Sequence, residues 1–320
     1  MREFNLLAIY ALLVLSVGAF VGEFLTLDNF REILVSVAIL MIVVIGETPV
    51  ILTRNIDISV GSIVGITAFV CGDLISTQPG TPIALVVLLG CVMGLLLGAI
   101  NGVLVTVANV PSIMATLATL YVYRGIDSLI ASGKQVSSST VPDSYAALAT
   151  SRMAGIPVMV LIAIAIGLAV GLFLRYRRAG RQLYAVGSNP DAARAAGIHS
   201  RRLVFGALCF SGLTAGLGGV LWSAQFATVT SDAATGLELQ VVAAAVVGGV
   251  NVFGGAGTVF GAMLGALVLA TISNALALTR VSQLWLQAIA GAALLIAVTA
   301  DHLAGRRTLA RALKQRRGAG

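Results

Sequence analysis

Charged residues are scarce in this sequence. Only 10% of its 320 residues are Asp, Glu, Lys or Arg, while 58% are hydrophobic and the mean hydropathy is +1.00. A soluble domain carries about 25% charged residues, and a water-soluble core of this length could not bury so much apolar surface. The composition excludes a soluble protein and predicts an all-α, polytopic membrane protein.

Cysteine and histidine are also rare. Cys71, Cys91 and Cys209 fall inside apolar runs and have neither disulfide nor metal-ligand spacing, so they are interpreted as small buried hydrophobic residues. His199 and His302 are isolated. We therefore expect no metal site and no cofactor.

Lysine occurs only twice, at Lys134 and Lys314, and neither lies in a G-x-x-x-x-G-K-[ST] phosphate-binding loop. No Ser-His-Asp arrangement is present, so we expect no catalytic residues and no enzyme activity. If the protein moves a solute, either a partner subunit hydrolyses ATP or an ion gradient drives the chain. The second alternative requires several acids within the membrane, and only Asp57 and Asp127, with two glutamates at span ends, are near candidates. The first alternative is favoured.

Apolar runs of roughly 20 residues, the length that crosses a bilayer, recur along the chain. The first run follows a basic start without a small-x-small cleavage site, so it is interpreted as a retained span. Two runs near the C-terminal end have no charged break between them and could form one long span. About ten transmembrane helices are predicted: 5–22, 33–50, 58–77, 82–102, 112–131, 156–174, 203–226, 238–251, 255–276 and 284–301.

Basic residues are concentrated in the loop 175–202 and in the tail after residue 302. Such residues stay on the cytoplasmic side. Six predicted spans precede the loop and four separate it from the tail, so the N-terminus, the loop and the C-terminus are all predicted to be cytoplasmic. This topology accounts for the basic residues without nucleic-acid binding.

Glycines recur four residues apart in two spans, a spacing that lets helix backbones approach closely in lipid. Ordinary packing of the helix bundle is the favoured interpretation. The stretches 90–111 and 261–282 also resemble each other faintly, which indicates possible duplicated halves. The spaced glycines are Gly90, Gly94 and Gly98 in one span and Gly257, Gly261 and Gly265 in the other.

Two stretches interrupt the apolar pattern. "TRNIDISVGS" (53–62) places charged residues at or near membrane depth, and "VVGGVNVFGGAG" (246–257) is rich in glycine. Such features are tolerated where they are buried in protein or line a cavity. Two alternatives remain open: Asp57 could cap the next helix, and Arg54 could extend its side chain to the interface.

A short helix is predicted within the cytoplasmic loop, in "GSNPDAARAAGI". Asparagine is a good N-cap, proline suits the first turn, an acid complements the positive helix end, and glycine suits the position after the last turn. About seven residues make a helix that is marginal in water, so we expect it to dock on something. A connector that packs on its own protein is the alternative. The residues concerned are Asn189, Pro190, Asp191, Ala192, Ala193, Arg194 and Gly197.

Three stretches together resemble the signature regions of the sugar-type permeases of bacterial ABC importers, which include ribose, xylose, rhamnose and autoinducer-2 transporters. They are "LTRNIDISVGS", "GRQLYAVGSNPDAARAAGI" and "VVGGVNVFGGAGTVFGAMLGA". The resemblance implies that the loop helix is the coupling helix that binds an ABC ATPase subunit, with Asp191 replacing a more common Glu. It also implies a second permease chain, forming a homo- or heterodimer, and a periplasmic or lipoprotein solute-binding protein.

The sequence is accordingly interpreted as a permease subunit in the bacterial inner membrane that imports a monosaccharide or sugar-like solute. "TRNID" favours the rhamnose or autoinducer-2 type over other pentoses and hexoses. We expect a transmembrane domain over 1–302 and a basic tail over 303–320. A self-sufficient ion-coupled secondary transporter is the main alternative, and a structural membrane scaffold is another. The polar residues expected near the translocation path are Asn55, Asp57, Ser59 and Asn251.

Overall fold

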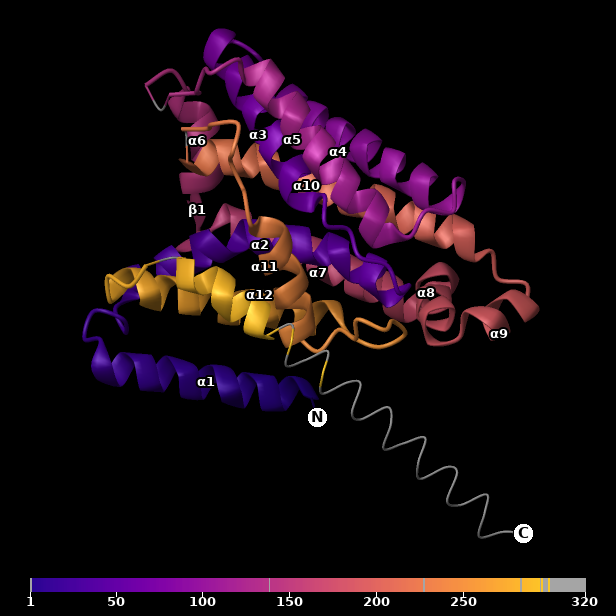
Figure 1. Ribbon diagram of the computed structural model, residues 1–320. Coiled ribbons are helices and arrows are strands. Elements are labelled where there is room, and N and C mark those ends of the chain that lie inside the picture. The colour runs from indigo at the N-terminus through magenta and orange to yellow at the C-terminus, as the bar shows by residue number, and fades with distance from the viewer. Residues whose placement is uncertain are drawn as a thin grey trace.

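The computed structural model describes residues 2–293 apart from Ser138, Ala227 and Gln283, together with Leu295 and Thr299. Most of these residues form helices, which run side by side in a bundle (Figure 1). The longer helices are α1 (Arg2–Phe20), α2 (Leu27–Leu52), α3 (Val60–Thr77), α4 (Ile83–Thr106), α5 (Ser112–Ala131), α7 (Val158–Tyr176), α10 (Ser200–Phe226) and α12 (Val259–Leu278). The shorter elements are α6 (Asp143–Thr150), the strands β1 (Arg152–Met153) and β2 (Ile156–Pro157), α8 (Arg178–Ser188), α9 (Pro190–Ala195) and α11 (Leu237–Val247).

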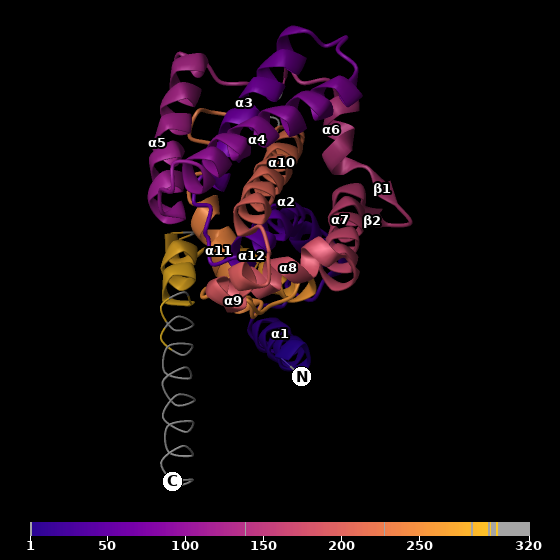
Figure 2. The same cartoon turned by 90° about the vertical axis from the view of Figure 1, so that its right-hand side faces the viewer.

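The helices form layers. In Figure 1, α3, α4, α5 and α10 lie above α2 and α7, while α11 and α12 lie below them and α1 lies at the outer edge. Helices α8 and α9 mark one end of the bundle and face the viewer in Figure 2. The β1–β2 hairpin, with Arg152 opposite Pro157, lies away from them. We call these the α8–α9 end and the opposite end.

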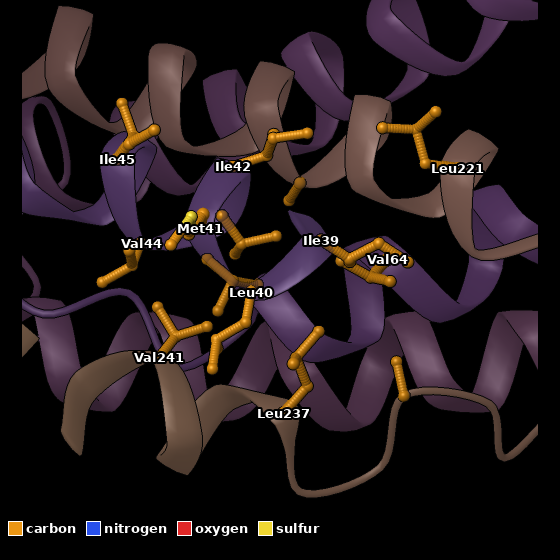
Figure 3. Close-up of a cluster of buried hydrophobic side chains, with 14 of the residues drawn as sticks. Ile39, Leu40, Met41, Ile42, Val44, Ile45, Val64, Leu221, Leu237 and Val241 are labelled. Carbon is orange, nitrogen blue, oxygen red and sulfur yellow. The ribbon is translucent and has the colours of Figure 1, made fainter. Parts of the chain in front are cut away.

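Helix α2 is the central element of the core. Its 26 residues are about 39 Å long at 1.5 Å per residue, and from Val37 to Leu52 every residue is buried. Around it lie α10, α3 and α11, which contribute side chains such as Leu221, Val64 and Val241 (Figure 3). A helix that is apolar on all sides is stable only when surrounded by other helices, and this is the position that α2 takes.

The predicted glycine spacing corresponds to close helix packing. In α4, Gly90, Gly94 and Gly98 face Gly212 and Gly216 of α10, and a Cβ atom on any of the three would collide with α10. The packing of α12 on α11 follows the same rule. There, Gly261 and Gly265 lie against the backbone of Ala244 and Gly248. The prediction that the spaced glycines serve bundle packing is confirmed for these five, whereas Gly257 lies before α12, where a Cβ atom would lie 2.7 Å from the backbone of Val250.

Six helices in the described part of the chain are long and apolar enough to cross a membrane: α2, α3, α4, α7, α10 and α12. Helix α5 has the predicted bounds 112–131, and α1 closely follows the predicted span 5–22. The predicted span 284–301 is described only in part, and the predicted tail 303–320 lies outside the described residues.

The predicted span 238–251 is wrong in length. Helix α11 has only 11 residues, about 16 Å, against a hydrocarbon core of about 30 Å. It ends where Gly248 and Gly249 follow, the latter with a φ of +86° that a helix cannot continue. Before α11, residues 228–236 are mostly non-helical, and the Arg124 side chain of α5 donates a hydrogen bond to the Ala233 carbonyl. The α10–α12 region therefore contains a discontinuous helix, not a simple span.

Candidate functional site

The predicted loop helix is present as α9 and has both predicted caps. The Asn189 side chain accepts a hydrogen bond from the Ala192 amide at 3.0 Å, and Pro190 is the first helical residue. At the other end, Gly197 has a φ of +74°, its amide bonds to the Arg194 carbonyl at 2.9 Å, and the Ile198 amide bonds to the Ala193 carbonyl at 3.0 Å. This bond pair is a Schellman motif. The helix is six residues long, about half the length of roughly 12 residues below which an isolated helix is marginal in water.

The surface of α9 is divided between two roles. Ala193 is 4% exposed and packs on the protein itself, whereas Asp191, Ala192 and Arg194 are exposed. Asp191 also forms an ion pair with Arg194 on this exposed face. The helix therefore both rests on its own chain, as the connector alternative predicted, and presents a small free face.

Helix α8 precedes α9 and was not predicted. The stretch "RAGRQLYAVGS" looks like a basic loop, but its apolar residues Leu183 and Val186 share one buried face. From this face the Tyr184 hydroxyl donates a hydrogen bond to the Gly257 carbonyl at 2.9 Å. Burial raises the pKa of the Tyr184 phenol, so the hydroxyl remains a donor at physiological pH. The helical period of this short stretch was the signal that could have revealed it.

All three signature stretches meet beside the junction of α8 and α9. Arg54, which follows α2, donates hydrogen bonds from Nε to the Gly187 carbonyl and from Nη2 to the Ser188 carbonyl, the latter at 2.8 Å. The Gly255 amide bonds to the Leu52 carbonyl at 3.0 Å. Arg54 is also exposed, so the alternative that it extends to an interface remains compatible with its two hydrogen bonds to another segment. We call this meeting point the three-motif junction, formed by residues 52–54, 187–188 and 254–257.

Close packing explains the glycines of the junction. A Cβ atom on Gly187 would collide with the Leu52 carbonyl, and one on Gly255 would lie 2.7 Å from the backbone of Ser188. Gly254 and Gly255 also have positive φ values, 80° and 73°. Glycine is required here because the backbone both turns and touches two other segments.

Asn251 organises the glycine-rich turn. Its side-chain oxygen accepts a hydrogen bond from the Phe253 amide at 2.7 Å, and its own amide bonds to the Ala256 carbonyl at 2.9 Å. These are turn contacts within one loop. The structure thus places Asn251 at the three-motif junction, in a different loop from Asn55, Asp57 and Ser59.

Asp57 and Ser59 are fully buried next to the junction, in a polar cluster that the sequence did not reveal. The Asp57 carboxyl Oδ1 accepts hydrogen bonds from the Ser59 amide at 2.9 Å and the Ser59 hydroxyl at 2.6 Å. Asp57 therefore satisfies a free amide at the start of α3, as the cap alternative predicted, while Ser59, the residue in the N-cap position, makes no side-chain cap hydrogen bond. The carboxyl of Glu47, also 0% exposed, accepts the Asp57 amide at 2.8 Å and the Ser211 hydroxyl at 3.2 Å.

Asn101 extends this cluster into α4 and α5. Its amide nitrogen donates to the Ser59 hydroxyl at 2.7 Å, and its oxygen accepts from the Thr119 hydroxyl at 2.7 Å. Asn55 lies at the edge of the cluster; its side chain donates to the Thr53 carbonyl and hydroxyl, both at 3.0 Å, and its backbone amide bonds to the Val50 carbonyl at 3.3 Å. The cluster joins α2, α3, α4, α5 and α10 near the α8–α9 end. Sequence reasoning missed Asn101, Ser211 and Thr119 because isolated polar residues inside apolar spans have no pattern.

Metal binding finds no support among the described residues. They contain no group of three or more His, Cys, Asp or Glu side chains placed to hold a metal ion. Cys71, Cys91 and Cys209 are all free.

Among the described residues, six apolar helices long enough to cross a membrane, together with the short helix α11 and a capped surface helix at one end, define a multi-pass membrane protein. Comparison with known proteins gives the family. Residues 29–298 match the family described as branched-chain amino acid transport system / permease component, and the chain belongs to this family. No solved structure matches it.

The relatives confirm the resemblance drawn from the three motifs. The autoinducer 2 import system permease protein LsrC of Salmonella typhi is 36% identical over 290 residues, which cover 91% of this chain and 82% of that protein. The LsrC protein of Yersinia enterocolitica is 38% identical over 291 residues, 91% of this chain and 79% of that protein. For Escherichia coli strain K12 the identity is 35% over 300 residues, 94% of this chain and 86% of that protein.

Proposed function

We propose that this chain is the permease subunit of an ATP-driven ABC importer that moves autoinducer 2 or a similar sugar-like solute into the bacterial cytoplasm. The observation that carries the proposal is the identity of 35–38% to autoinducer 2 import permeases over more than nine tenths of the chain. The chain itself does no covalent chemistry. An ABC ATPase, a second permease chain and a solute-binding protein complete the system.

The α8–α9 end is cytoplasmic in this proposal. Seven arginines between 175 and 202 lie on or beside α8 and α9, and basic loops stay on the cytoplasmic side. About ten membrane segments in a domain over 1–302 then leave the N-terminus and the basic tail 303–320 in the cytoplasm. The glycine-mediated contacts of α4 with α10 and of α11 with α12 are compatible with two duplicated halves.

The exposed face of α9 is the coupling surface. Ala192 and Arg194 are available to an ATPase groove, while Ala193 holds the helix against the permease. Asn189, Pro190 and Gly197 fix the two helix ends, and Asp191 is the acid of the motif. Because Arg54 ties the α8–α9 junction to the end of α2, a displacement of α9 is passed directly to the central helix of the bundle.

Asn55, Asp57, Ser59 and Asn251 lie at the cytoplasmic end of the translocation path in this proposal. Asp57 and Ser59 are 0% exposed and hold several helices together. These contacts would have to loosen when the path opens to the cytoplasm, so the cluster and the junction act as a closed cytoplasmic gate.

The decisive experiment is transport in liposomes that contain the permease, with and without the ATPase and the binding protein. We expect uptake of autoinducer 2 only when both partners and ATP are present. Uptake by the permease alone, driven by a proton or sodium gradient, would show a secondary transporter. Uptake of a sugar but not of autoinducer 2 would retain the importer and change its substrate.

The coupling surface has a separate test. Ala192→Arg places a long charged side chain on the exposed face of α9 and should prevent co-purification with the ATPase, while insertion into the membrane is retained. Ala154, in the β1–β2 turn, is also exposed, so Ala154→Arg is the matched control and should bind the ATPase normally. Normal binding of the Ala192→Arg variant would rule out this surface.

A further inference from the structure

A cavity of about 570 Å³, open to the surface on one side, lies at the flank of the bundle, away from the three-motif junction. Its walls come from the first half of α2, the last turn of α10, the start of α11 and the second half of α12, together with Ser282, Leu284, Leu286 and Gln287. Helix α2 runs from the opposite end to the α8–α9 end, so the residues Glu32 to Leu40 place the cavity in the half of the bundle away from α8 and α9. Its size is within the range of about 300–1,000 Å³ that small-molecule sites occupy.

The polar lining of the cavity is almost entirely neutral. It contains the amides of Gln225, Gln240 and Gln287 and the hydroxyls of residues such as Ser36 and Thr235. The side-chain oxygen of Gln225 is buried and has no hydrogen-bond partner in the described structure, although buried polar atoms are normally paired. This oxygen is closed off from the cavity, so the groups that could bind a ligand are the other lining amides and hydroxyls.

The charge of the lining also restricts which ligands the cavity can bind. None of the described lining residues is Lys, Arg or His, and Glu32 is the one that carries charge. A phosphate or carboxylate group would enter without a positive partner and beside a negative one, which is unfavourable at membrane depth. The cavity therefore fits an uncharged ligand and excludes anions.

Aromatic and aliphatic groups complete the wall. Trp222 and Phe226 both line the cavity, with ring centroids 4.6 Å apart and ring planes at 44°. Ile39, Leu40 and Leu269 provide an aliphatic surface. A cyclic solute with hydroxyls on its edge and C–H groups on its faces satisfies both kinds of surface.

Helix α11 connects this cavity with the three-motif junction. At its start, Gly236 has a φ of +86°, and a Cβ atom there would lie 3.1 Å from the Gln287 side-chain nitrogen. Leu237 and Gln240 line the cavity. At its other end the chain enters the glycine-rich turn, whose Gly255 binds the Leu52 carbonyl. Half-helices that end at midplane sites are a recurring feature of transporters.

We propose that this cavity binds the transported solute within the membrane and that its ligand is a small uncharged molecule rich in hydroxyl groups. The inference rests on the proposed function of the chain as an importer. It adds the place where the solute is held, a place distinct from Asn55, Asp57, Ser59 and Asn251, and it predicts that phosphorylated solutes are not carried. When solute occupies the cavity, helix α11 transmits the resulting movement to the three-motif junction.

The first test measures uptake of autoinducer 2 against concentration by the complete complex in liposomes. Gln240→Leu removes one amide from the cavity, and we expect the solute concentration for half-maximal uptake to rise about threefold to tenfold. Gln78→Leu, an exposed glutamine after α3, is the matched control and should behave as the unmodified protein. Unchanged uptake by Gln240→Leu and by Gln225→Leu would overturn the proposal.

The second test does not depend on transport. In a background with Cys71, Cys91 and Cys209 changed to alanine, Ser36→Cys places a thiol in the cavity and Ser151→Cys places one on the surface. Autoinducer 2 should protect the first thiol, but not the second, from a water-soluble maleimide. Equal labelling with and without solute, or protection by a sugar phosphate, would overturn the proposal.

These tests separate the cavity from the importer function. If the unmodified complex carries no autoinducer 2, the proposed function fails. The labelling experiment then still decides the cavity, with neutral monosaccharides at millimolar concentration as the probe. Protection of Ser36→Cys by any of them supports the cavity, and protection by none overturns it.

Discussion

The side chain of Arg54 binds the carbonyl groups of two residues more than 130 positions away, Gly187 and Ser188. These carbonyls belong to the end of α8, where four orphan carbonyls need partners and the helix dipole is negative. The arginine therefore joins the end of the central helix α2 to the segment that leads into α9. In the proposed function, a force applied to α9 would reach the core of the bundle through this contact.

Arg54→Met keeps much of the aliphatic side chain and removes both hydrogen bonds. Hydrogen bonds from a charged donor contribute about 1.5–3 kcal/mol each. Their loss therefore weakens the contact between the end of α2 and the end of α8. We expect ATPase binding to persist and solute uptake per ATP hydrolysed to fall about tenfold or more.

The matched control is Arg31→Met. Arg31 pairs with Asp28 on an exposed face of α2, and exposed pairs of this kind contribute only about 0–1 kcal/mol. Uptake by this variant should be normal. If Arg54→Met also transports normally, the junction does not transmit the movement.

Gly94→Ala tests the packing of α4 on α10. The added Cβ atom would collide with the Gly212 carbonyl and approach the Gly216 backbone to 2.7 Å. These are backbone atoms that cannot rotate away, so the helices must separate. We expect a loss of about 1–3 kcal/mol in the free energy of unfolding, seen as a lower midpoint of thermal unfolding in detergent.

Gly171→Ala is the control for this substitution. Gly171 also lies inside a membrane helix, α7, but nothing comes within 4 Å of a Cβ atom built there. Alanine is the better helix former by about 1 kcal/mol, so the variant should be as stable as the unmodified protein or more so. Equal destabilisation of the two variants would mean that glycine spacing does not determine this interface.

Glu47→Gln and Glu47→Ala distinguish hydrogen bonding from charge in the buried cluster. The glutamine can still accept the Asp57 amide and can donate to the Ser211 hydroxyl, so its cost should stay below about 1 kcal/mol. Alanine leaves the Asp57 amide without a partner and opens a cavity, at a cost of about 1–3 kcal/mol or more. Thermal unfolding of both variants measures this difference, and equal loss in both would show that the charge itself is required.

The sequence predicts the long helices well because their signal is simple. Apolar runs of about 20 residues have few structural alternatives in lipid, and prolines mark their starts, as Pro111 does directly before α5. The cap residues of α9 could also be predicted from the sequence, because Asn189 and Gly197 act through local backbone geometry. Local rules of this kind need no knowledge of the fold.

The site itself could be predicted only in part. Asp57 and Ser59 stood out as polar residues in an unusual stretch, but their partners Asn101 and Ser211 come from helices far along the chain. Only the folded bundle brings such residues together. The length of α11 was misjudged for a related reason, since glycine-rich apolar sequence can continue a span or turn, and tertiary contacts decide which.

Asn189→Ala tests whether the caps of α9 act locally. Its side chain satisfies the Ala192 amide, and loss of an N-cap costs about 0.5–2 kcal/mol. Because Ala193 is the one buried residue of this six-residue helix, little else holds the helix formed. We therefore expect faster hydrogen exchange of the α9 amides and weaker binding to the ATPase, with no change in the midpoint of global thermal unfolding.

Asn189→Asp should behave nearly as the unmodified protein, since aspartate is an equally good N-cap and its charge favours the helix N-terminus. A fall in global stability in the alanine variant would show instead that α9 is part of the cooperative core. Unchanged exchange together with unchanged ATPase affinity would show that the ordered form of α9 does not depend on its cap. The predicted pattern, local loosening with rescue by aspartate, follows only if this small helix is held at its ends and free on the face that meets a partner.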